Sequence, residues 1–339
     1  MPNTTNISTP LQKAKSPIER LLALAAKDMA AIDVIILERM QSPVGLIPDL
    51  AAHLVGAGGK RLRPLLTVAS AHLCGYDGEH HHKLAAAVEF IHSATLLHDD
   101  VVDDSALRRG RKTANLVWGN SPSILVGDFL FARAFNLMVE TQSLEALGIL
   151  SNASSVIAEG EVQQLAALRD IDMTESVYMD VIGAKTAALF AAAAEVSPVI
   201  AGRPVTERSA LRAYGHELGM AFQLVDDALD YGGFESALGK SVGDDFREGK
   251  MTLPVIRAYA SANDKDKAFW KRVIVEDKQT DMDFERAVSM LRATGSLQST
   301  LDEAVRRAGN ARKALAIFPD SPWKATLSEL AEFVVERAF

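Results

Sequence analysis

Long stretches rich in alanine and leucine, with apolar residues at helical spacing, constrain the fold of this chain more than any other feature. Strand signals, meaning alternating β-branched residues between tight turns, are scarce. The helical stretches are residues 17–39, 64–74, 82–105, 122–142, 145–168, 174–196 and 206–231, with shorter ones after residue 252. No segment rich in proline, glycine or serine divides them. We therefore predict an all-α protein with one domain of roughly a dozen helices.

Several helix starts are marked in the sequence. Ser16–Glu19 offers an N-cap, a proline at the first helical position and a capping-box glutamate. Ser121 and Ser321 each precede a proline in the same way, and Thr206 is expected to cap the helix that runs to Tyr231. Residues 1–14 are polar and rich in proline and threonine, which predicts a disordered tail before a domain spanning residues 15–339.

Composition narrows the function classes. The chain of 339 residues is 48% apolar and 24% charged, as in soluble globular proteins, and its net charge of −8 disfavours nucleic acid as a partner. Its one cysteine, Cys74, follows an apolar run and is expected to be a buried, unpaired residue, which fits a cytoplasmic location. Residues 187–194 form the most apolar stretch, but Glu195 and Pro198 interrupt it, so we expect no transmembrane segment.

The first motif that carries chemistry is HDDVVDD, residues 98–104, at the end of a predicted helix. Asp99 and Asp103 are four residues apart and share one helical face, and Asp100 and Asp104 form a second such pair. Like charges at this spacing repel, and a helix C-terminus disfavours anions. The cluster therefore indicates bound cations, with a solvated acidic helix end as the alternative.

The second motif, QLVDDALDYGG at residues 223–233, places Asp226 and Asp230 at the same spacing. If the two helices face each other, their carboxylates define an oxygen-rich pocket suited to Mg²⁺. This ion prefers carboxylates, water and substrate phosphates as ligands. The two motifs together indicate a diphosphate bridged to the protein by Mg²⁺, which would stabilise charge on departing pyrophosphate.

Basic residues that could hold phosphate lie in four further places. Each one alone is more often a solvated surface charge. Lys185 differs because it lies in a strongly apolar helix, where a buried lysine needs an anionic partner. The four places are GGKRLRP at 58–64, with Lys60, Arg61 and Arg63; Arg108-Arg109; Lys185-Thr186; and Lys240 with Lys250. Two acidic and four basic sites together indicate two phosphate-bearing substrates.

In these motifs the sequence resembles the trans-isoprenyl diphosphate synthases, or polyprenyl synthetases, over residues 15–339. The matching motifs are GGKRLRP at 58–64, LLHDDVVDDSALRRG at 96–110, Lys185-Thr186, FQLVDDALDY at 222–231 and GKSVGDDFREGK at 239–250. The resemblance implies a helical bundle around a central cavity, usually a homodimer. It also implies condensation of isopentenyl diphosphate with an allylic diphosphate by ionisation, condensation and elimination, with peripheral membrane contact when the product is released.

The resemblance further implies a role for each matching residue. Asp99 and Asp103 would bind Mg²⁺ that holds the allylic diphosphate, Asp226 would bind a third ion, and Asp100 and Asp230 would support them. The allylic diphosphate would contact Arg108, Lys185, Gln223 and Lys240, with Thr186 near the reacting carbons. Isopentenyl diphosphate would contact Lys60, Arg63, His92 and Arg109. Lys250 is a weaker candidate for phosphate binding. Thr186, Gln223 and the Phe222 ring could stabilise the allylic cation, although Phe222 fits a core role equally well.

Product length depends on the residues beneath the first aspartate motif. Ala94 and Thr95 lie about one helical turn before Asp99, and neither is aromatic. In short-chain members of the family a bulky residue here closes the tunnel. The small residues, and the wording HSATLLHDDVVDD, resemble the octaprenyl-to-decaprenyl synthases that make quinone side chains. A farnesyl or geranylgeranyl product is the alternative, since another helix could supply a plug.

Three other functions fit part of the sequence. A class I terpene cyclase uses DDxxD, but such enzymes usually replace the second motif and lack GGKRLRP. A ferritin-like di-metal protein needs two Glu-x-x-His pairs on facing helices, whereas the pairs here, Glu89–His92 and Glu79–His82, are too near in sequence. A regulatory synthase subunit would lose aspartates that this chain keeps. The run His80–His82 is expected to be a solvent-facing loop, because no paired ligands lie nearby in sequence.

Overall fold

The computed structural model describes residues 16–56, 61–108, 110–232 and 242–336, and these are helical almost throughout. The strands in this part are β1 (Leu107–Arg108) and β2 (Arg111–Lys112), which form one short antiparallel hairpin. The all-α prediction is therefore confirmed. The predicted tail, residues 1–14, lies outside the described residues.

The first half of the chain forms the helices that carry the first aspartate motif. They are α1 (Pro17–Leu24), α2 (Ala26–Arg39), α3 (Leu46–Gly56), α4 (Leu62–Leu73), α5 (His80–Val102), α6 (Ala114–Trp118), α7 (Asn120–Glu140) and α8 (Leu144–Ala166).

The second half carries the other motif and closes the bundle. Its elements are α9 (Glu175–Ile182), the π-helical turn η1 (Gly183–Ala187), α10 (Ala188–Ile200), α11 (Val205–Gly232), α12 (Asp244–Glu248), α13 (Leu253–Ala260), α14 (Asp264–Trp270), the π-helical turn η2 (Lys271–Val275), α15 (Asp283–Ala293), α16 (Ser296–Ala314), the 3₁₀ turn η3 (Leu315–Ile317) and α17 (Pro322–Glu336).

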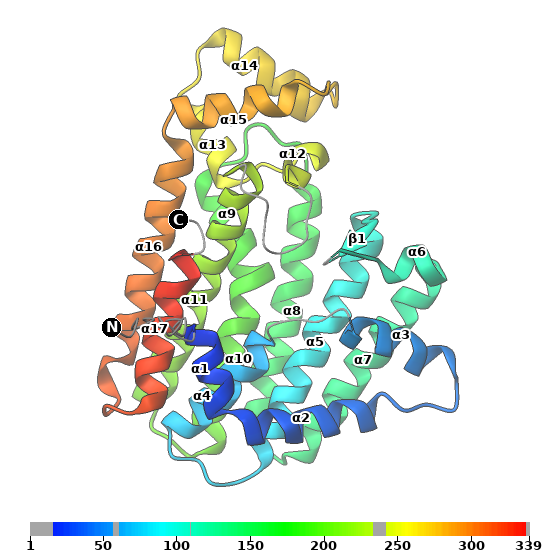
Figure 1. Ribbon diagram of the computed structural model, residues 1–339, viewed down its shortest axis with the longest axis vertical. Helices are drawn as coiled ribbons and strands as arrows, with labels where there is room; N and C mark the ends of the chain where they lie inside the picture. Colours follow the sequence, from blue (N-terminus) through cyan, green and yellow to red (C-terminus); the bar gives the residue numbers. More distant parts are fainter. Residues whose placement is uncertain (1–15, 57–60, 109, 233–241, 337–339) are drawn as a thin grey trace, which may run out of the picture.

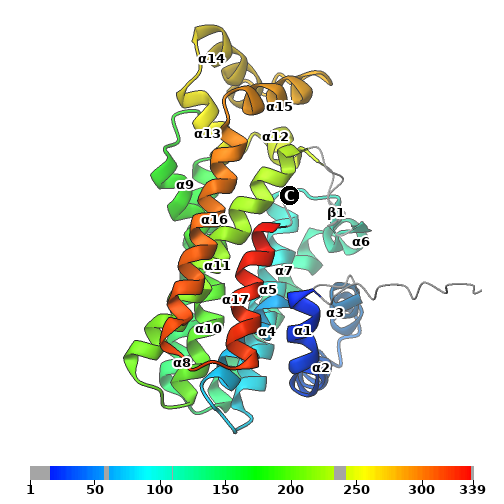
Figure 2. The same cartoon turned by 60° about the vertical axis from the view of Figure 1, so that its left-hand side comes forward.

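The long helices α5, α7, α8, α10, α11 and α16 run along the long axis of the molecule, and α14 and α15 cap its upper end in the view of Figure 1. Helix α10 lies in the middle and packs against α4, α5, α8 and α11. It is buried on nearly all sides, as its lack of a polar face predicts. Figure 2 shows α16, α17 and α1 side by side over this layer.

The structure confirms two of the four predicted helix starts. Ser16 and Glu19 form a complete capping box, and the Ser321 side chain accepts the Lys324 N–H at 3.2 Å. The other two predictions are wrong by two residues, because Ser121 and Thr206 lie inside their helices rather than before them. Helix α7 begins at Asn120 because Gly119 turns the chain with φ 92°, and α11 begins at Val205 because the carbonyl of Pro204 already accepts helical N–H groups.

The sequence predicted that Glu195 and Pro198 interrupt the apolar stretch in the middle of the chain. In the structure the helix instead continues through both residues to Ile200. Pro198 lies inside α10, near its end, where the missing N–H removes one hydrogen bond from the last turns. The segments Asn120–Glu140 and Glu175–Ile200 are, by length and composition alone, long and apolar enough to cross a membrane. In the second, 61% of the apolar window is buried inside the protein, as in the core helix of a bundle.

Three glycines allow the central helices to approach closely. A Cβ atom on Gly215 would lie 2.3 Å from the Phe190 carbonyl oxygen, and one on Gly219 would lie 2.7 Å from Ala187 Cα. A Cβ atom on Gly160 of α8 would lie 2.7 Å from Ala184 Cβ. Helices α8 and α11 therefore contact η1 and α10 backbone to backbone, which fixes the position of η1.

The predictions for Cys74 and for the run His80–His82 have opposite outcomes. Cys74 is buried and unpaired, as expected, and burial raises the pKa of its thiol to about 12. The prediction of a solvent-facing loop at His80–His82 is wrong, because α5 begins at His80 and buries His81. His81 and His82 contact Asp28 of α2, which is more than fifty residues away in sequence.

Candidate active site

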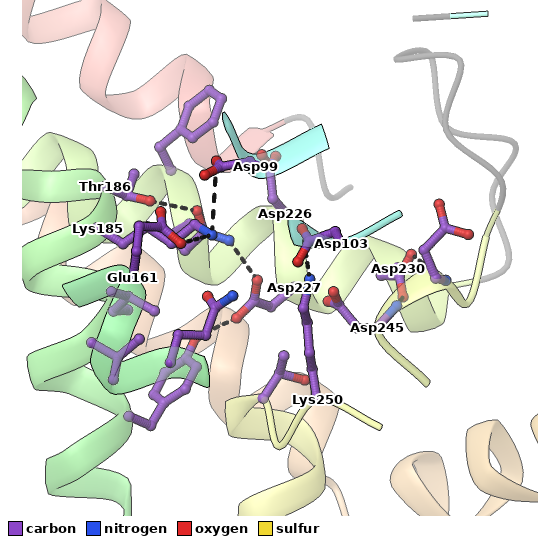
Figure 3. A pocket seen from close by; sticks show the side chains of 18 of the residues that line it. Asp99, Asp103, Glu161, Lys185, Thr186, Asp226, Asp227, Asp230, Asp245 and Lys250 are labelled. Atoms are coloured by element: carbon purple, nitrogen blue, oxygen red, sulfur yellow. Dashed lines mark hydrogen bonds and ion pairs between the residues drawn. The ribbon is translucent and has the colours of Figure 1, made fainter. Parts of the chain in front are cut away.

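A cavity of about 380 Å³ lies where the C-terminal ends of α5 and α11 meet α8, α9, η1 and residues 242–252. Figure 3 shows carboxylates from these elements pointing toward one another. The described residues on its wall include eight carboxylates, namely Asp99, Asp103, Glu161, Asp226, Asp227, Asp230, Asp244 and Asp245. The lysines and arginines among them are Arg63, Arg108, Lys185 and Lys250. Negative charge is therefore in excess at one end of the bundle.

The first aspartate motif divides into two roles. Asp99 and Asp103 line the cavity, as their shared face predicts. Asp100 is not part of the wall and is 1% exposed. Its Oδ1 accepts a hydrogen bond from Arg108 Nε at 2.7 Å and forms an ion pair with Arg108 Nη2 at 2.7 Å. The β-hairpin that follows the motif returns Arg108 to the cavity wall. The expected Asp100–Asp104 pair does not form, because the helix ends at Val102 and Asp104 adopts a left-handed conformation with φ 48°.

The three aspartates of the second motif also differ in burial and in hydrogen-bond partners. Asp226 lines the cavity, whereas Asp227 is 4% exposed and accepts hydrogen bonds from Tyr178 Oη at 2.5 Å and Gln223 Nε2 at 2.7 Å. Asp230 accepts backbone N–H groups of residues 243–245 at 3.0–3.3 Å. Asp230 therefore anchors the N-terminus of α12, where a negative charge is favourable.

The π-helical turn η1 carries the predicted Lys185-Thr186 pair into the cavity. Lys185 Nζ lies 2.8 Å from Glu161 Oε2 and 3.9 Å from Asp99 Oδ2 (Figure 3), so the predicted anionic partner exists. Thr186 Oγ1 donates to Gln223 Oε1 at 2.8 Å. Single π-helical turns inside α-helices are frequent at functional sites, because they redirect side chains without ending the helix.

Burial and mutual repulsion make several of these carboxylates harder to ionise. Burial raises the pKa of Asp99 to about 6, against the opposing effect of Lys185. Burial, followed by repulsion from Asp245, also raises the pKa values of Asp227 and Asp230. Clustered oxygen ligands that resist ionisation fit a site for hard divalent cations, whose charge would offset this repulsion.

One consequence concerns stability in the absence of metal. Native Asp99 keeps its proton up to about pH 6, whereas the unfolded chain releases it near pH 3.8, so the metal-free protein loses stability as pH rises through this window. We expect Asp99→Asn to raise the free energy of unfolding by about 2 kcal/mol at pH 7.5 and by much less at pH 4. Urea unfolding in EDTA measures this. Asp180→Asn, at an exposed site on α9, is the control, and equal gains at both pH values would contradict the prediction.

The structure places the remaining predicted residues as follows. Arg63 and His92 lie on the wall, with Arg63 Nη1 3.1 Å from His92 Nε2. Lys250 Nζ lies 3.4 Å from Asp103 Oδ2 and also pairs with Glu248. Phe222 and Thr95 line the cavity, while Ala94 is fully buried and is not part of the wall. Lys60, Arg109 and Lys240 lie outside the described residues.

Several wall residues were missed in the sequence. They include Glu161, Tyr178, Asp227, Asp244 and Asp245. Asp227 stands inside the second DDxxD run, so its presence could have been inferred. The need of Lys185 for a partner indicated an acid, but only the packing of α8 against η1 identifies Glu161.

Comparisons with known proteins agree on one family. The polyprenyl synthetase family model matches residues 45–291. The octaprenyl diphosphate synthase of Escherichia coli K12 is 46% identical over 320 residues, which are 94% of this chain and 99% of that protein. A polyprenyl synthase from Caulobacter crescentus CB15, crystallised with calcium and isoprenyl diphosphate, has a TM-score of 0.92 at 56% identity, covering 97% of this chain and 100% of its own. A decaprenyl diphosphate synthase from Rhodobacter capsulatus has a TM-score of 0.92 at 54% identity, covering 95% and 100%.

Proposed function

Because the chain belongs to the polyprenyl synthetase family and is a prenyltransferase, we propose that it condenses isopentenyl diphosphate with an allylic diphosphate into a long-chain polyprenyl diphosphate. The observation that carries this proposal is the meeting of Asp99, Asp103, Asp226 and Lys185 on one cavity. The octaprenyl and decaprenyl synthases among its relatives favour a long product, suited to a quinone side chain, over a farnesyl or geranylgeranyl product.

The aspartates on the wall are the residues that would hold the metal. Asp99, Asp103 and Asp226 line the cavity, and the polyprenyl synthase of Caulobacter crescentus was crystallised with calcium, a divalent ion. We assign them to Mg²⁺, with Asp226 holding a third ion. When bound, Mg²⁺ would neutralise the diphosphate and stabilise the charge that develops as it leaves. Asp100 and Asp230 support the site indirectly, through Arg108 and α12.

The side chains around these aspartates explain how the protein would promote the reaction. Lys185 and Arg108, with Lys240, bind the allylic diphosphate, and Arg63 and His92, with Lys60 and Arg109, bind isopentenyl diphosphate. The carbon–oxygen bond to pyrophosphate breaks, the alkene of isopentenyl diphosphate forms the new carbon–carbon bond, and a proton passes to the departing pyrophosphate. The Thr186 and Gln223 oxygens face the allylic cation, and apolar wall residues such as Leu96 and Phe222 keep water away from it.

The test is incubation of the purified protein with isopentenyl diphosphate, an allylic primer and Mg²⁺, followed by sizing of the dephosphorylated products. We expect long polyprenols and no turnover in EDTA, with activity restored by added Mg²⁺. Turnover that persists in EDTA would contradict the metal assignment. Products that stop at farnesol or geranylgeraniol would contradict the long-chain assignment alone.

The residues one turn beneath Asp99 test how product length is set. We expect Ala94→Phe to shorten the product, because a ring beneath the aspartates blocks the path of the growing chain. Thin-layer chromatography of the dephosphorylated products measures this. Thr95→Phe is the companion variant, since Thr95 lies on the cavity wall, whereas Ala94 is fully buried and is not part of it. Unchanged length in Ala94→Phe with shortening in Thr95→Phe would move the role to Thr95.

We also propose a homodimer in the cytoplasm. Helix α7 exposes a set of apolar side chains, namely Ile124, Leu125, Phe135 and Val139, with Leu125 66% exposed. Apolar area of this kind on one helix marks a protein contact. Sedimentation velocity is expected to give a dimer mass, and a monomer at micromolar concentration would contradict this proposal.

A further inference from the structure

Three histidines converge on one aspartate at the end of α5 opposite to the active site. His72 Nε2 of α4 lies 3.0 Å from Asp28 Oδ2, whereas His81 Nε2 and His82 Nε2 of α5 lie 3.0 and 2.9 Å from Asp28 Oδ1. His81 and Asp99 are eighteen positions apart on α5, which corresponds to about 27 Å of helix. This cluster therefore has no part in the diphosphate site.

The ligand atoms have a spacing that suits a metal ion. One carboxylate oxygen of Asp28 and one ring nitrogen each of His81 and His82 lie within 4.8 Å of one another. Zinc bonds of about 2.0–2.1 Å in a tetrahedral site place neighbouring ligand atoms about 3.3 Å apart. The observed contacts of 2.9–3.0 Å are a few tenths of an ångström shorter, so small side-chain rotations would admit an ion.

The surrounding packing fixes these rings before any ion binds. His81 is 3% exposed, and its ring meets Tyr76 edge-on with the centroids 5.6 Å apart. The His72 ring stacks on Trp323 of α17 at 4.5 Å and 3°. His72 also holds the second oxygen of Asp28, as outer-sphere residues do for carboxylate ligands in metal sites.

The chemistry of the donor set indicates which ion would fit. The Asp28 carboxylate is enclosed by three imidazoles, at 2.9–3.0 Å. Two imidazoles and one carboxylate form a donor set that suits zinc and its neighbours in the first transition row, whereas Mg²⁺ and Ca²⁺ prefer all-oxygen sites.

We propose that Asp28, His81 and His82 bind a divalent transition metal ion of the zinc class, with His72 orienting the carboxylate. The site joins α2 to α5 directly and to α4 through His72, while the Trp323 stack extends it to α17. We assign it a structural role, because it lies far from the reacting groups; three protein ligands leave the fourth position to water. The sequence concealed it, since Asp28 is separated from the histidines by more than forty residues.

The experiment is a zinc titration of EDTA-dialysed protein in excess Mg²⁺, which saturates the aspartate motifs, with bound zinc measured by elemental analysis. We expect a single zinc ion per chain, and at least about tenfold weaker binding in His82→Gln and in Asp28→Asn. His80→Gln is the matched control, because His80 is the exposed neighbour in the same helical turn. Asp99→Asn is expected to bind zinc as the unmodified protein does.

Zinc X-ray absorption on the unmodified protein tests the same site without a substitution, and we expect scattering from at least two imidazoles. Circular dichroism and prenyl transfer identify any variant that has failed to fold. Absence of saturable zinc binding, or an absorption spectrum without imidazole scattering, would overturn the proposal. So would equal affinity in folded His82→Gln and His80→Gln. None of these outcomes bears on the proposed prenyl transfer.

Discussion

Asp99→Asn is expected to lower kcat/KM for prenyl transfer by at least about 1,000-fold. The substitution keeps the shape of the side chain but removes one of the carboxylates that would hold Mg²⁺, next to Lys185 Nζ at 3.9 Å. Because metal and diphosphate charges act together as the carbon–oxygen bond breaks, most of the loss is expected in kcat. The measurement is steady-state turnover with radiolabelled isopentenyl diphosphate at saturating Mg²⁺.

Asp104→Asn is the matched control for this experiment. Asp104 belongs to the same HDDVVDD run, but it is exposed and has a left-handed backbone, which asparagine tolerates. We expect its turnover to remain within a few-fold of the unmodified protein. Asp226→Asn on the second motif is expected to match the loss in Asp99→Asn. Near-normal turnover in a folded Asp99→Asn or Asp226→Asn variant would show that the metal assignment is wrong.

Gly215→Ala is expected to destabilise the protein by about 3 kcal/mol, because it forces two central helices apart. A Cβ atom on Gly215 would lie 2.3 Å from the carbonyl oxygen and 2.8 Å from the carbonyl carbon of Phe190. These are backbone atoms of a fully packed helix, so no side-chain rotation can relieve the clash. Urea denaturation followed by circular dichroism measures the change in unfolding free energy.

Gly309→Ala on α16 is the control for the same chemical change. A Cβ atom there meets nothing within 4 Å, so alanine is expected to stabilise the helix by about 0.5–1 kcal/mol. Opposite signs in the two variants would show that the close approach of α10 and α11 decides the effect. A neutral or stabilising Gly215→Ala would contradict the backbone contact between these helices.

The two Asp99 predictions together describe a conflict between stability and function. The same buried carboxylate that destabilises the metal-free protein above pH 6 is expected to be indispensable for turnover. The substitution should therefore give a more stable and inactive protein, which separates the effect of the charge from damage to the fold.

Local signals in the sequence were sufficient for the class of fold and for most of the site. Helical spacing predicted the all-α architecture, because the position of apolar residues on a helix is set by its own geometry. The two aspartate motifs were found for the same reason, since four-residue spacing places their carboxylates on one face. Lys185 was found by its apolar setting, whereas the roles of Thr186 and Gln223 came only from the resemblance to the family. The capping box at Ser16 was also local, and the structure contains it.

Long-range contacts decided the rest. Glu161 joins the site only because Gly160 lets α8 contact η1, and Asp100 pairs with Arg108 because the hairpin that follows the motif brings the two together. The cluster around Asp28 contains side chains from three helices and could not be predicted from residues 80–82 alone. The sequence by itself determined which side chains share a helical face. Only the tertiary structure decided which faces meet, because packing between helices depends on volume and backbone approach that no single segment contains.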